Sequence, residues 1–180
     1  KLLERSRETL RKNLATAPNK KSYRDGDSIG KSHTLRLRDG VRENIELKNL
    51  DIIITCPKNS PTIARDRLIK TGVEKALRKE AKAYLPRELR FFAMKFGFHY
   101  ERVQFTHAKS RWGSCSSTGT ISLNIMLMTL PQELLDYVVL HELNHTIHMN
   151  HSAAFWVDLE KICPHAKEKR RKLRDFSPYL

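Results

Sequence analysis

The sequence has few cysteines and no long apolar run. Its 180 residues include only three cysteines, Cys56, Cys115 and Cys163, which are far apart and form no C-x-x-C pair. This scarcity argues against a disulfide framework and a cysteine-rich zinc finger, and it favours a reducing compartment, the cytoplasm. No apolar run approaches the roughly 18 residues of a membrane-spanning helix. No apolar signal region opens the chain either, so we expect no membrane association.

Acidic residues are also scarce. The chain has 20 Asp and Glu against 34 Lys and Arg, a net charge of +14. The excess is uneven, because residues 101–150 hold only 3 basic and 4 acidic side chains. A basic excess can attract nucleic acid or an acidic partner, although a solvated surface is the commoner reason for it. The best candidate for nucleic-acid binding is a basic stripe on one face of a predicted helix, made of Lys75, Arg78, Lys79 and Lys82.

The composition is that of a soluble globular domain, with 39% hydrophobic and 30% charged residues. We expect residues 1–30 to form a basic lead-in or arm and residues 31–180 to form a single domain. Alternating and apolar patterns predict secondary structure along this domain. The prediction is three antiparallel strands at 33–38, 43–48 and 51–55, a helix over 60–85, a second helix from Pro86 to Phe96 that Gly97 ends, and strands at 100–107 and 119–124 around a loop at 109–118.

One stretch of the chain carries a recognisable chemical pattern, His141-Glu142-Leu143-Asn144-His145. In a helix, residues four apart lie on the same face, so His141 and His145 can bind one metal ion. Two such histidines with an intervening Glu form the zinc-binding helix signature of metallopeptidases. The residues from Leu134 to Leu143 are apolar on nearly every side, which predicts a buried helix whose ionisable groups need a partner. The alternative is a helix that contains two histidines without binding metal.

A third ligand is needed, because a catalytic zinc has three protein ligands and one open position. His148 lies seven residues after His141 and would lean towards the same face of an unbroken helix. His151 follows Asn150, a residue that readily takes the left-handed conformation that ends a helix. We favour His151 over His148. If both were ligands, the site would be closed and its zinc structural.

Five short motifs resemble, in their order, the YgjP-like metallopeptidase family, which is grouped with the HtpX-type and SprT-like zincins. They are Ser110-Arg111-Trp112-Gly113-Ser114-Cys115-Ser116, Ile121-Ser122-Leu123-Asn124, Leu130-Pro131, Asp136-Tyr137-Val138-Val139 with the histidine motif, and Asn150-His151-Ser152 with Phe155-Trp156. The resemblance implies that His141, His145 and His151 bind zinc and that Glu142 is the catalytic base. The ligand spacing also equals that of the metzincins, but His148 stands where those enzymes have Gly and no later Met can form their turn.

The expected fold is therefore an α+β zincin-like domain. It would contain N-terminal antiparallel strands, an edge strand at 119–124 that pairs with an extended peptide, and the buried H-E-x-x-H helix. Candidate substrate contacts are Arg111, Trp112 and Ile121. Asp136 and Asp158 are candidates for orienting a ligand imidazole.

The expected function is zinc-dependent hydrolysis of peptide bonds in the cytoplasm, with Glu142 as the base for the attacking water. Two alternatives remain at this point. One is a nucleic-acid-associated protease of the SprT-like type. The other is a basic nucleic-acid-binding module whose zinc is structural.

Overall fold

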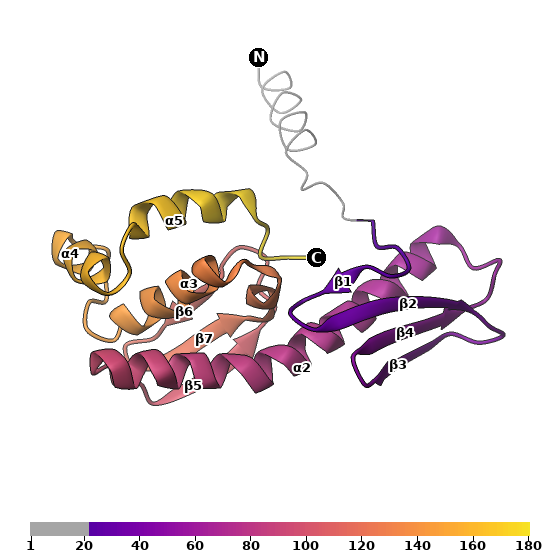
Figure 1. Ribbon diagram of the computed structural model, residues 1–180, viewed down its shortest axis with the longest axis horizontal. Coiled ribbons are helices and arrows are strands. Elements are labelled where there is room, and N and C mark those ends of the chain that lie inside the picture. The colour runs from indigo at the N-terminus through magenta and orange to yellow at the C-terminus, as the bar shows by residue number, and fades with distance from the viewer. Residues whose placement is uncertain (1–21) are drawn as a thin grey trace, which may run out of the picture.

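The computed structural model describes residues 22–180, so most of the predicted arm lies outside the described residues. The fold is α+β, with two small sheets joined by one long helix (Figure 1). The division at residue 30 stays a prediction, although Ser28 and Ile29 already pair with the next strand. The elements are β1 Ser28–Ile29, β2 His33–Asp39, β3 Asn44–Lys48, β4 Asp51–Cys56, α2 Thr62–Phe96, β5 Arg102–Thr106, β6 Gly113–Cys115, β7 Thr120–Asn124, η1 Ile125–Thr129, α3 Gln132–Asn144, α4 Ala153–Ile162, α5 Ala166–Lys172 and η2 Leu173–Asp175.

The first sheet has the strand order β1-β2-β4-β3 and is mixed. Strands β3 and β4 form an antiparallel hairpin, but β2 pairs in parallel with β4, Leu35 opposite Ile52. The prediction that these strands are all antiparallel is therefore wrong. The cause is burial: Ile52, Ile53 and Ile54 are all buried, so β4 takes the central position. Strand β3, which alternates between half-buried and exposed residues, takes the edge.

The second sheet repeats this arrangement, with the order β5-β7-β6. Strand β5 is parallel to β7, and β6 is antiparallel to it. Strand β7, predicted to be the edge strand, is therefore the central one and has no free edge. Its residues Ile121, Leu123 and Asn124 are fully buried, which explains its place. The edges of this sheet are β5 and β6, and β6 lies inside the stretch that we predicted to be a loop.

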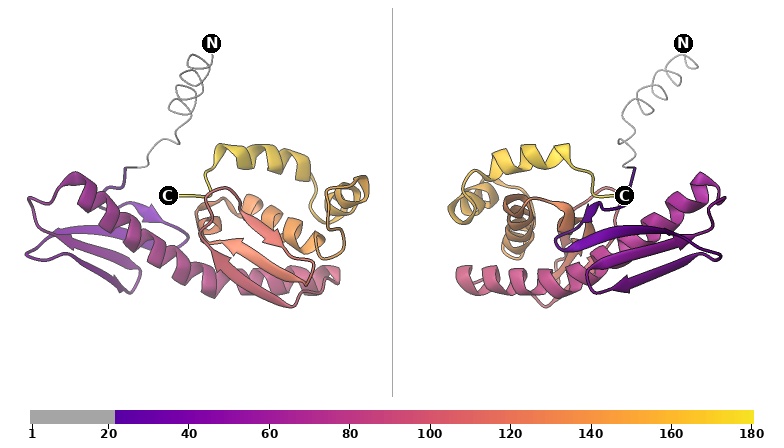
Figure 2. Two further views of the ribbon diagram at one scale, coloured as in Figure 1. Left: turned by 180° about the vertical axis from the view of Figure 1, so that it is seen from behind. Right: turned by 45° about the vertical axis from the view of Figure 1, so that its right-hand side comes forward.

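Helix α2 runs along most of the length of the molecule and packs on both sheets (Figures 1 and 2). Pro86 lies inside this helix, so the prediction that it starts a second helix is wrong. Leu85 and Leu89 on either side of it are fully buried, and their packing outweighs the hydrogen bond that Pro cannot donate. Gly97 ends the helix in the left-handed conformation (φ 74°), as predicted. No helix among residues 22–180 is long and apolar enough to cross a bilayer.

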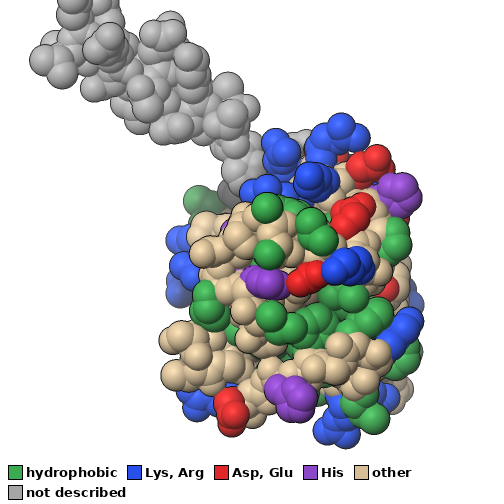
Figure 3. Space-filling model, turned by 90° about the vertical axis from the view of Figure 1, so that its left-hand side faces the viewer, with side chains coloured by type: hydrophobic (Ala, Val, Ile, Leu, Met, Phe, Trp, Pro, Cys, Tyr) green, Lys and Arg blue, Asp and Glu red, His purple; other side chains and the backbone are tan. Residues whose placement is uncertain are grey.

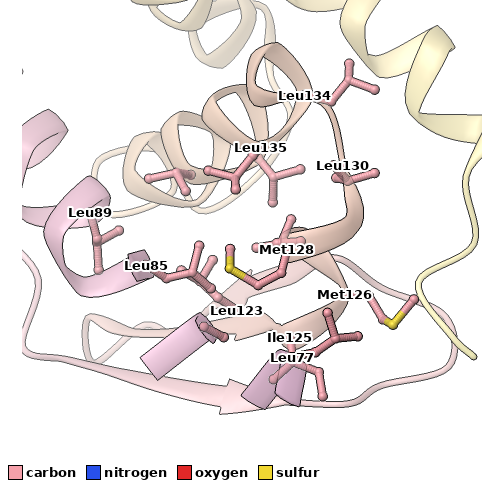
Figure 4. Close-up of a cluster of buried hydrophobic side chains, with 14 of the residues drawn as sticks. Leu77, Leu85, Leu89, Leu123, Ile125, Met126, Met128, Leu130, Leu134 and Leu135 are labelled. Carbon is pink, nitrogen blue, oxygen red and sulfur yellow. The ribbon is translucent and has the colours of Figure 1, made fainter. Parts of the chain in front are cut away.

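The core that supports α3 is drawn in Figure 4. Leucines of α2 meet apolar side chains of β7, η1 and α3, and the labelled set includes Leu77, Leu85, Leu89, Leu123, Ile125, Met128, Leu134 and Leu135. Full burial of each such side chain contributes roughly 1.5–3 kcal/mol. Helix α3, which carries the H-E-x-x-H residues, therefore rests on a well-packed base.

A buried carboxylate on α2, Glu80, fixes the turn between β1 and β2. The backbone N–H groups of Lys31 and Ser32 and the Ser32 hydroxyl donate to it at 2.7, 3.0 and 2.8 Å, and His33 Nδ1 lies 2.6 Å from it. Gly30 has φ 65°, and a Cβ there would collide with this carboxylate. The turn is thus built around Glu80, and glycine is required at its tightest point.

The same turn reaches the beginning of the H-E-x-x-H helix. Lys31 Nζ donates a hydrogen bond of 2.7 Å to the backbone carbonyl of Leu130. Leu130 directly precedes Pro131, the N-cap of α3. The first sheet is thereby tied to the start of the helix that carries the candidate site.

Candidate metal centre

Helix α3 is buried almost all round, as its apolar pattern predicts. Asn144, its last residue, is buried and donates from Nδ2 to the backbone carbonyl of Phe155 in α4 at 2.9 Å. His145 follows as the C-cap and keeps helical dihedral angles (φ −68°, ψ −14°). His141 and His145 therefore remain on the same face of the helix although the second one lies just past its end.

Three imidazoles converge at this end of α3. One ring nitrogen from each of His141, His145 and His151 lies within 4.8 Å of the others, and Nε2 of His141 is 3.0 Å from Nε2 of His151. The chain reaches His151 through a turn at Asn150, whose side-chain oxygen accepts from the N–H of Ser152 at 3.2 Å. These three residues form the only such group of potential metal ligands among residues 22–180.

Two aromatic residues of α4 hold the imidazoles in place. Phe155 is fully buried, and its ring centroid lies 5.0, 4.7 and 4.8 Å from those of His141, His145 and His151. Trp156 stacks on His151 at 5.9 Å with an interplanar angle of 26°. Ser152 caps α4 by accepting from the N–H of Phe155 at 3.3 Å, as its place before the helix predicts. Sequence analysis found Phe155 and Trp156 only as parts of a motif and missed this supporting role.

His148, the competing candidate for the third ligand, faces away from the cluster. Its Nε2 lies 2.8 Å from Asp158 Oδ2, and Lys161 donates to the other oxygen of the same carboxylate at 2.7 Å. The backbone carbonyl of His148 accepts a hydrogen bond of 2.8 Å from Nδ1 of His145. Because that bond places the proton on Nδ1, Nε2 of His145 is left with a free lone pair.

The residues that orient the ligand rings differ from those expected. Asp158 pairs with His148, and Asp136 accepts from Gln132 at 2.7 Å, so neither carboxylate contacts the three imidazoles. The contacts come instead from the His148 carbonyl and from the hydroxyl of Tyr137, 3.4 Å from Nδ1 of His141. The position of Tyr137 four residues before His141 was a usable signal. A backbone carbonyl leaves no signature in the sequence.

Burial keeps His141 uncharged. Burial, together with the neighbouring His145 and His151 and with Arg170, lowers the pKa of His141 to about 3. The pKa of His151 is lowered as well, chiefly by burial and by His145. Neutral imidazole is the form that binds a metal ion, so the lowered pKa values of His141 and His151 favour metal binding by these two rings.

Glu142 lies beside this cluster, and its side chain is enclosed. The residue is 5% exposed, and its Oε2 atom has no hydrogen-bond partner among the described residues. Burial raises the pKa of Glu142 to about 8, against the opposing influence of Arg111. A buried carboxyl with an unused oxygen is costly for a purely structural residue, and it has the raised proton affinity expected of a base.

The wall opposite Glu142 is strand β6, where a glycine permits close approach. A Cβ at Gly113 would lie 2.6 Å from Oε1 and 2.7 Å from Cγ of Glu142. Such distances are too short for any side chain, so the sheet and α3 can meet here only through a glycine. Gly113 is a site residue that sequence analysis missed; the signal was a glycine between Trp112 and a run of serines.

The three predicted substrate contacts occupy different environments. Arg111 is exposed and Trp112 is half-buried, and both directly precede β6 beside Glu142. Ile121 is fully buried in the central strand β7, so its side chain belongs to the core. Among the three, Arg111 has its charge near the site, because it opposes the burial effect on the pKa of Glu142.

The basic stripe lies on α2, whereas the three imidazoles lie at the end of α3 and in the segment that follows it. Lys75, Lys79 and Lys82 are exposed, whereas Arg78 is half-buried. Arg78 donates to Glu74 Oε1 at 2.9 Å and to the backbone carbonyl of Phe105 at 3.5 Å, so it is engaged within the fold.

Comparison with known proteins identifies a family for this chain. The profile of the YgjP-like metallopeptidase domain matches residues 1–176. The structure is similar to the metallopeptidase zymogen abylysin of Pyrococcus abyssi, with 28% identity, a TM-score of 0.46, and coverage of 51% of this chain and 93% of that one. It is also similar to the zymogen jannalysin of Methanocaldococcus jannaschii, with 23% identity, a TM-score of 0.44, and coverage of 49% and 92%. No match was found among curated proteins. None of these similarities points to nucleic-acid binding.

Proposed function

The chain belongs to the YgjP-like metallopeptidase family, and from this we propose that it is a zinc-dependent peptidase. His141, His145 and His151 would hold the zinc ion, and Glu142 would be the catalytic base. One observation carries the proposal: three imidazoles converge at the end of α3, and Glu142, which directly follows His141 on that helix, has a buried carboxylate oxygen with no hydrogen-bond partner among residues 22–180. A metal ion and a water molecule would satisfy both groups together.

The donor set suits zinc. Three imidazole nitrogens form a ligand set common in catalytic zinc sites, and it leaves one position open. Carboxylate-preferring ions such as Mg²⁺ and Ca²⁺ are poorly matched, because they take oxygen ligands. A closed structural site would need a fourth protein ligand, and the His148 ring, the nearest candidate in sequence, faces Asp158 instead. The alternative of a structural zinc is therefore disfavoured.

The role of the chain's own residues follows from their positions. A bound zinc ion supplies Lewis-acid chemistry, which polarises the scissile carbonyl and lowers the pKa of water. Glu142 would take the proton of the attacking water on its carboxylate, which makes no strong hydrogen bond that would hold it in its ionised form. It then gives that proton to the leaving nitrogen of the peptide. Phe155 and Trp156 exclude water from one side and keep the imidazoles in a single arrangement.

We further propose that β6 is the strand that pairs with the substrate, in place of 119–124. An extended peptide binds to a sheet by adding to an unpaired strand edge. Strand β7 is paired on both sides, whereas β6 is paired only with β7 among the described strands. Its residue Gly113 adjoins Glu142, so a peptide on the outer edge of β6 would pass the catalytic base.

The cellular setting stays part of the proposal. All three cysteines, Cys56, Cys115 and Cys163, are free thiols, which suits a reducing compartment such as the cytoplasm. The nucleic-acid alternatives are disfavoured, because the family to which the chain belongs is a metallopeptidase family. The basic stripe is set on α2, and one of its members, Arg78, is bound to Glu74.

The ligand assignment can be tested by metal analysis of matched variants. His151→Ala should lose most of its zinc after dialysis against a weak chelator, together with peptidase activity. His148→Ala is the control, because that ring binds Asp158, and it should keep one zinc per chain. Elemental analysis gives the stoichiometry, and circular dichroism checks the fold. Full zinc content in His151→Ala would show that the third ligand is wrong.

A further inference from the structure

Two arginines near the candidate metal centre, Arg111 and Arg170, make no ion pair among the described residues. Arg111 precedes β6, and its backbone carbonyl is held by Asn124 Nδ2 at 3.0 Å. Its side chain is exposed, and its charge is felt by Glu142. Gly113, two residues later, packs against Glu142. Arg111 is therefore close to the site on the side formed by β6.

Arg170 of α5 lies against the aromatic residues of α4. Its guanidinium carbon lies 5.2 Å from the ring centroid of Trp156. Trp156 in turn stacks on His151 and makes an edge contact with His141 at 6.4 Å. A guanidinium lying over an indole is held in one orientation and keeps its N–H groups free for a ligand.

The carboxylates nearest to this site in sequence are already engaged. Asp158 pairs with His148 and Lys161. Glu160 accepts from the backbone N–H groups of His165 and Ala166 at 2.7 and 3.1 Å. Glu142 is buried. The face where α4 and the C-terminal end of α2 lie shows hydrophobic side chains over its middle and Lys and Arg around much of its rim (Figure 3).

A pair of unpaired cations beside a divalent metal site raises the electrostatic energy of the free protein. An anionic ligand bound between them would relieve this repulsion. Guanidinium groups match carboxylates in particular, because their planar fork donates two parallel hydrogen bonds.

We propose that Arg111 and Arg170 select carboxylate-bearing peptides, one arginine on each side of the scissile bond. This inference rests on the proposed peptidase function. The carboxylate is either the side chain of an Asp or Glu residue or the free C-terminus of the peptide. The net charge of +14 would draw such substrates towards the protein.

The test uses degenerate heptapeptide pools with Glu, Gln or Lys at the central position, each with a free or an amidated C-terminus. We expect zinc-loaded protein to cleave the Glu pool, or the free-acid pools, with a kcat/KM about tenfold above the neutral counterpart. Arg111→Gln and Arg170→Gln should each remove most of this preference. Arg170→Glu should shift it towards the Lys pool, which loss of Trp156 packing alone would not do. The control is Arg171→Gln on the exposed side of α5, which should keep the preference.

Binding gives a second readout that does not depend on turnover. The Glu142→Gln protein, titrated with fluorescein-labelled pools, should bind the preferred pool about tenfold more tightly than the amide or Gln pool. If wild-type protein cleaves all pools equally, the arginine inference is overturned while the peptidase proposal stands. If no pool is cleaved but binding still favours the carboxylate, the peptidase proposal fails and the arginine pair keeps its role. Equal binding of all pools overturns the inference in either case.

Discussion

Two buried glutamates, one in each half of the molecule, have opposite surroundings. Glu80 lies under the first sheet with 7% exposure, and Glu142 lies under β6 with 5% exposure. Burial would raise the pKa of Glu80, but hydrogen bonds from Lys31, His33 and Ser32 outweigh it and lower the pKa. Glu142 has no such donors for Oε2, and its pKa rises to about 8.

The comparison separates a structural carboxylate from a chemical one. Residue type and burial are nearly the same, so they cannot decide the role. The number of hydrogen bonds distinguishes them, because donors to the ionised carboxylate lower its affinity for a proton, whereas burial without such donors raises it. Glu80 stabilises a turn, whereas the unused oxygen of Glu142 is available for reaction.

The largest expected effect is on turnover in Glu142→Gln. The amide has the same shape, so zinc content and the unfolding transition should stay close to wild type. Loss of a general base typically lowers the rate by about 10²–10⁴. Steady-state cleavage of an unfolded protein substrate measures turnover. Elemental analysis measures zinc content, and a denaturant titration measures the unfolding transition. Near-normal turnover by zinc-loaded Glu142→Gln would contradict the base assignment.

The second effect is on stability, in Glu80→Gln. Of the four bonds to the turn, Oε2 accepts one and Oε1 accepts three, so an amide group in place of either oxygen would lose at least one of them. We expect a cost of about 2–3 kcal/mol of unfolding free energy. The folded-state pKa of Glu80 lies below its ordinary value of 4.5. Its contribution is therefore present above that value and is lost as the pH falls through the folded-state pKa. The difference between wild type and variant should be full at pH 7 and shrink below pH about 4.

Urea titrations of wild type and Glu80→Gln, at pH 7 and below pH about 4, test this prediction. His33 and Lys31 are left intact in both proteins. An equal difference at neutral and acidic pH would show that the Glu80 carboxylate is not what stabilises the turn. Zinc content in this variant should match wild type as long as the protein is folded, which distinguishes Glu80 from the residues of the metal centre.

A smaller effect is expected from Gly113→Ala. The new Cβ would push against the Glu142 side chain, which must shift from its place beside the imidazoles. Displacement of a catalytic group of this kind should lower turnover about tenfold. The effect should vanish in the Glu142→Gln background, so the double-mutant cycle gives the coupling. Independent losses in the cycle would mean that Gly113 acts through something other than Glu142.

The sequence predicted best those features that depend on a single helix or on its ends. The H-E-x-x-H spacing places two imidazoles on one face of any helix. The left-handed helix end expected at Asn150 is wrong, because α3 already ends at Asn144 and Asn150 has no positive φ, but the chain still brings His151 to the other two imidazoles. The helix end at Gly97 and the Ser152 cap are also local features, and both are confirmed.

Features that depend on distant partners could not be predicted. Period-two patterns give the faces of a strand but not its neighbours, which is why the parallel β2–β4 pair was missed. The break expected at Pro86 ignored the packing of Leu85 and Leu89 on both sides. The contrast between Glu80 and Glu142 was invisible, because the donors to Glu80 come from a turn nearly fifty residues earlier.

The repeated strand order of the two sheets has a consequence for how the chain can be assembled. In each sheet the last strand in sequence, β4 or β7, lies between two earlier strands and pairs with both of them, β2 and β3 or β5 and β6. Among the described residues no strand pairs across the sheets, so each sheet is complete within its own stretch, 28–56 or 102–124. A chain growing from its N-terminus can therefore close the first sheet before the second has been synthesised. The three histidines proposed as metal ligands all come later in the chain and are then added to a scaffold whose first half is already in place.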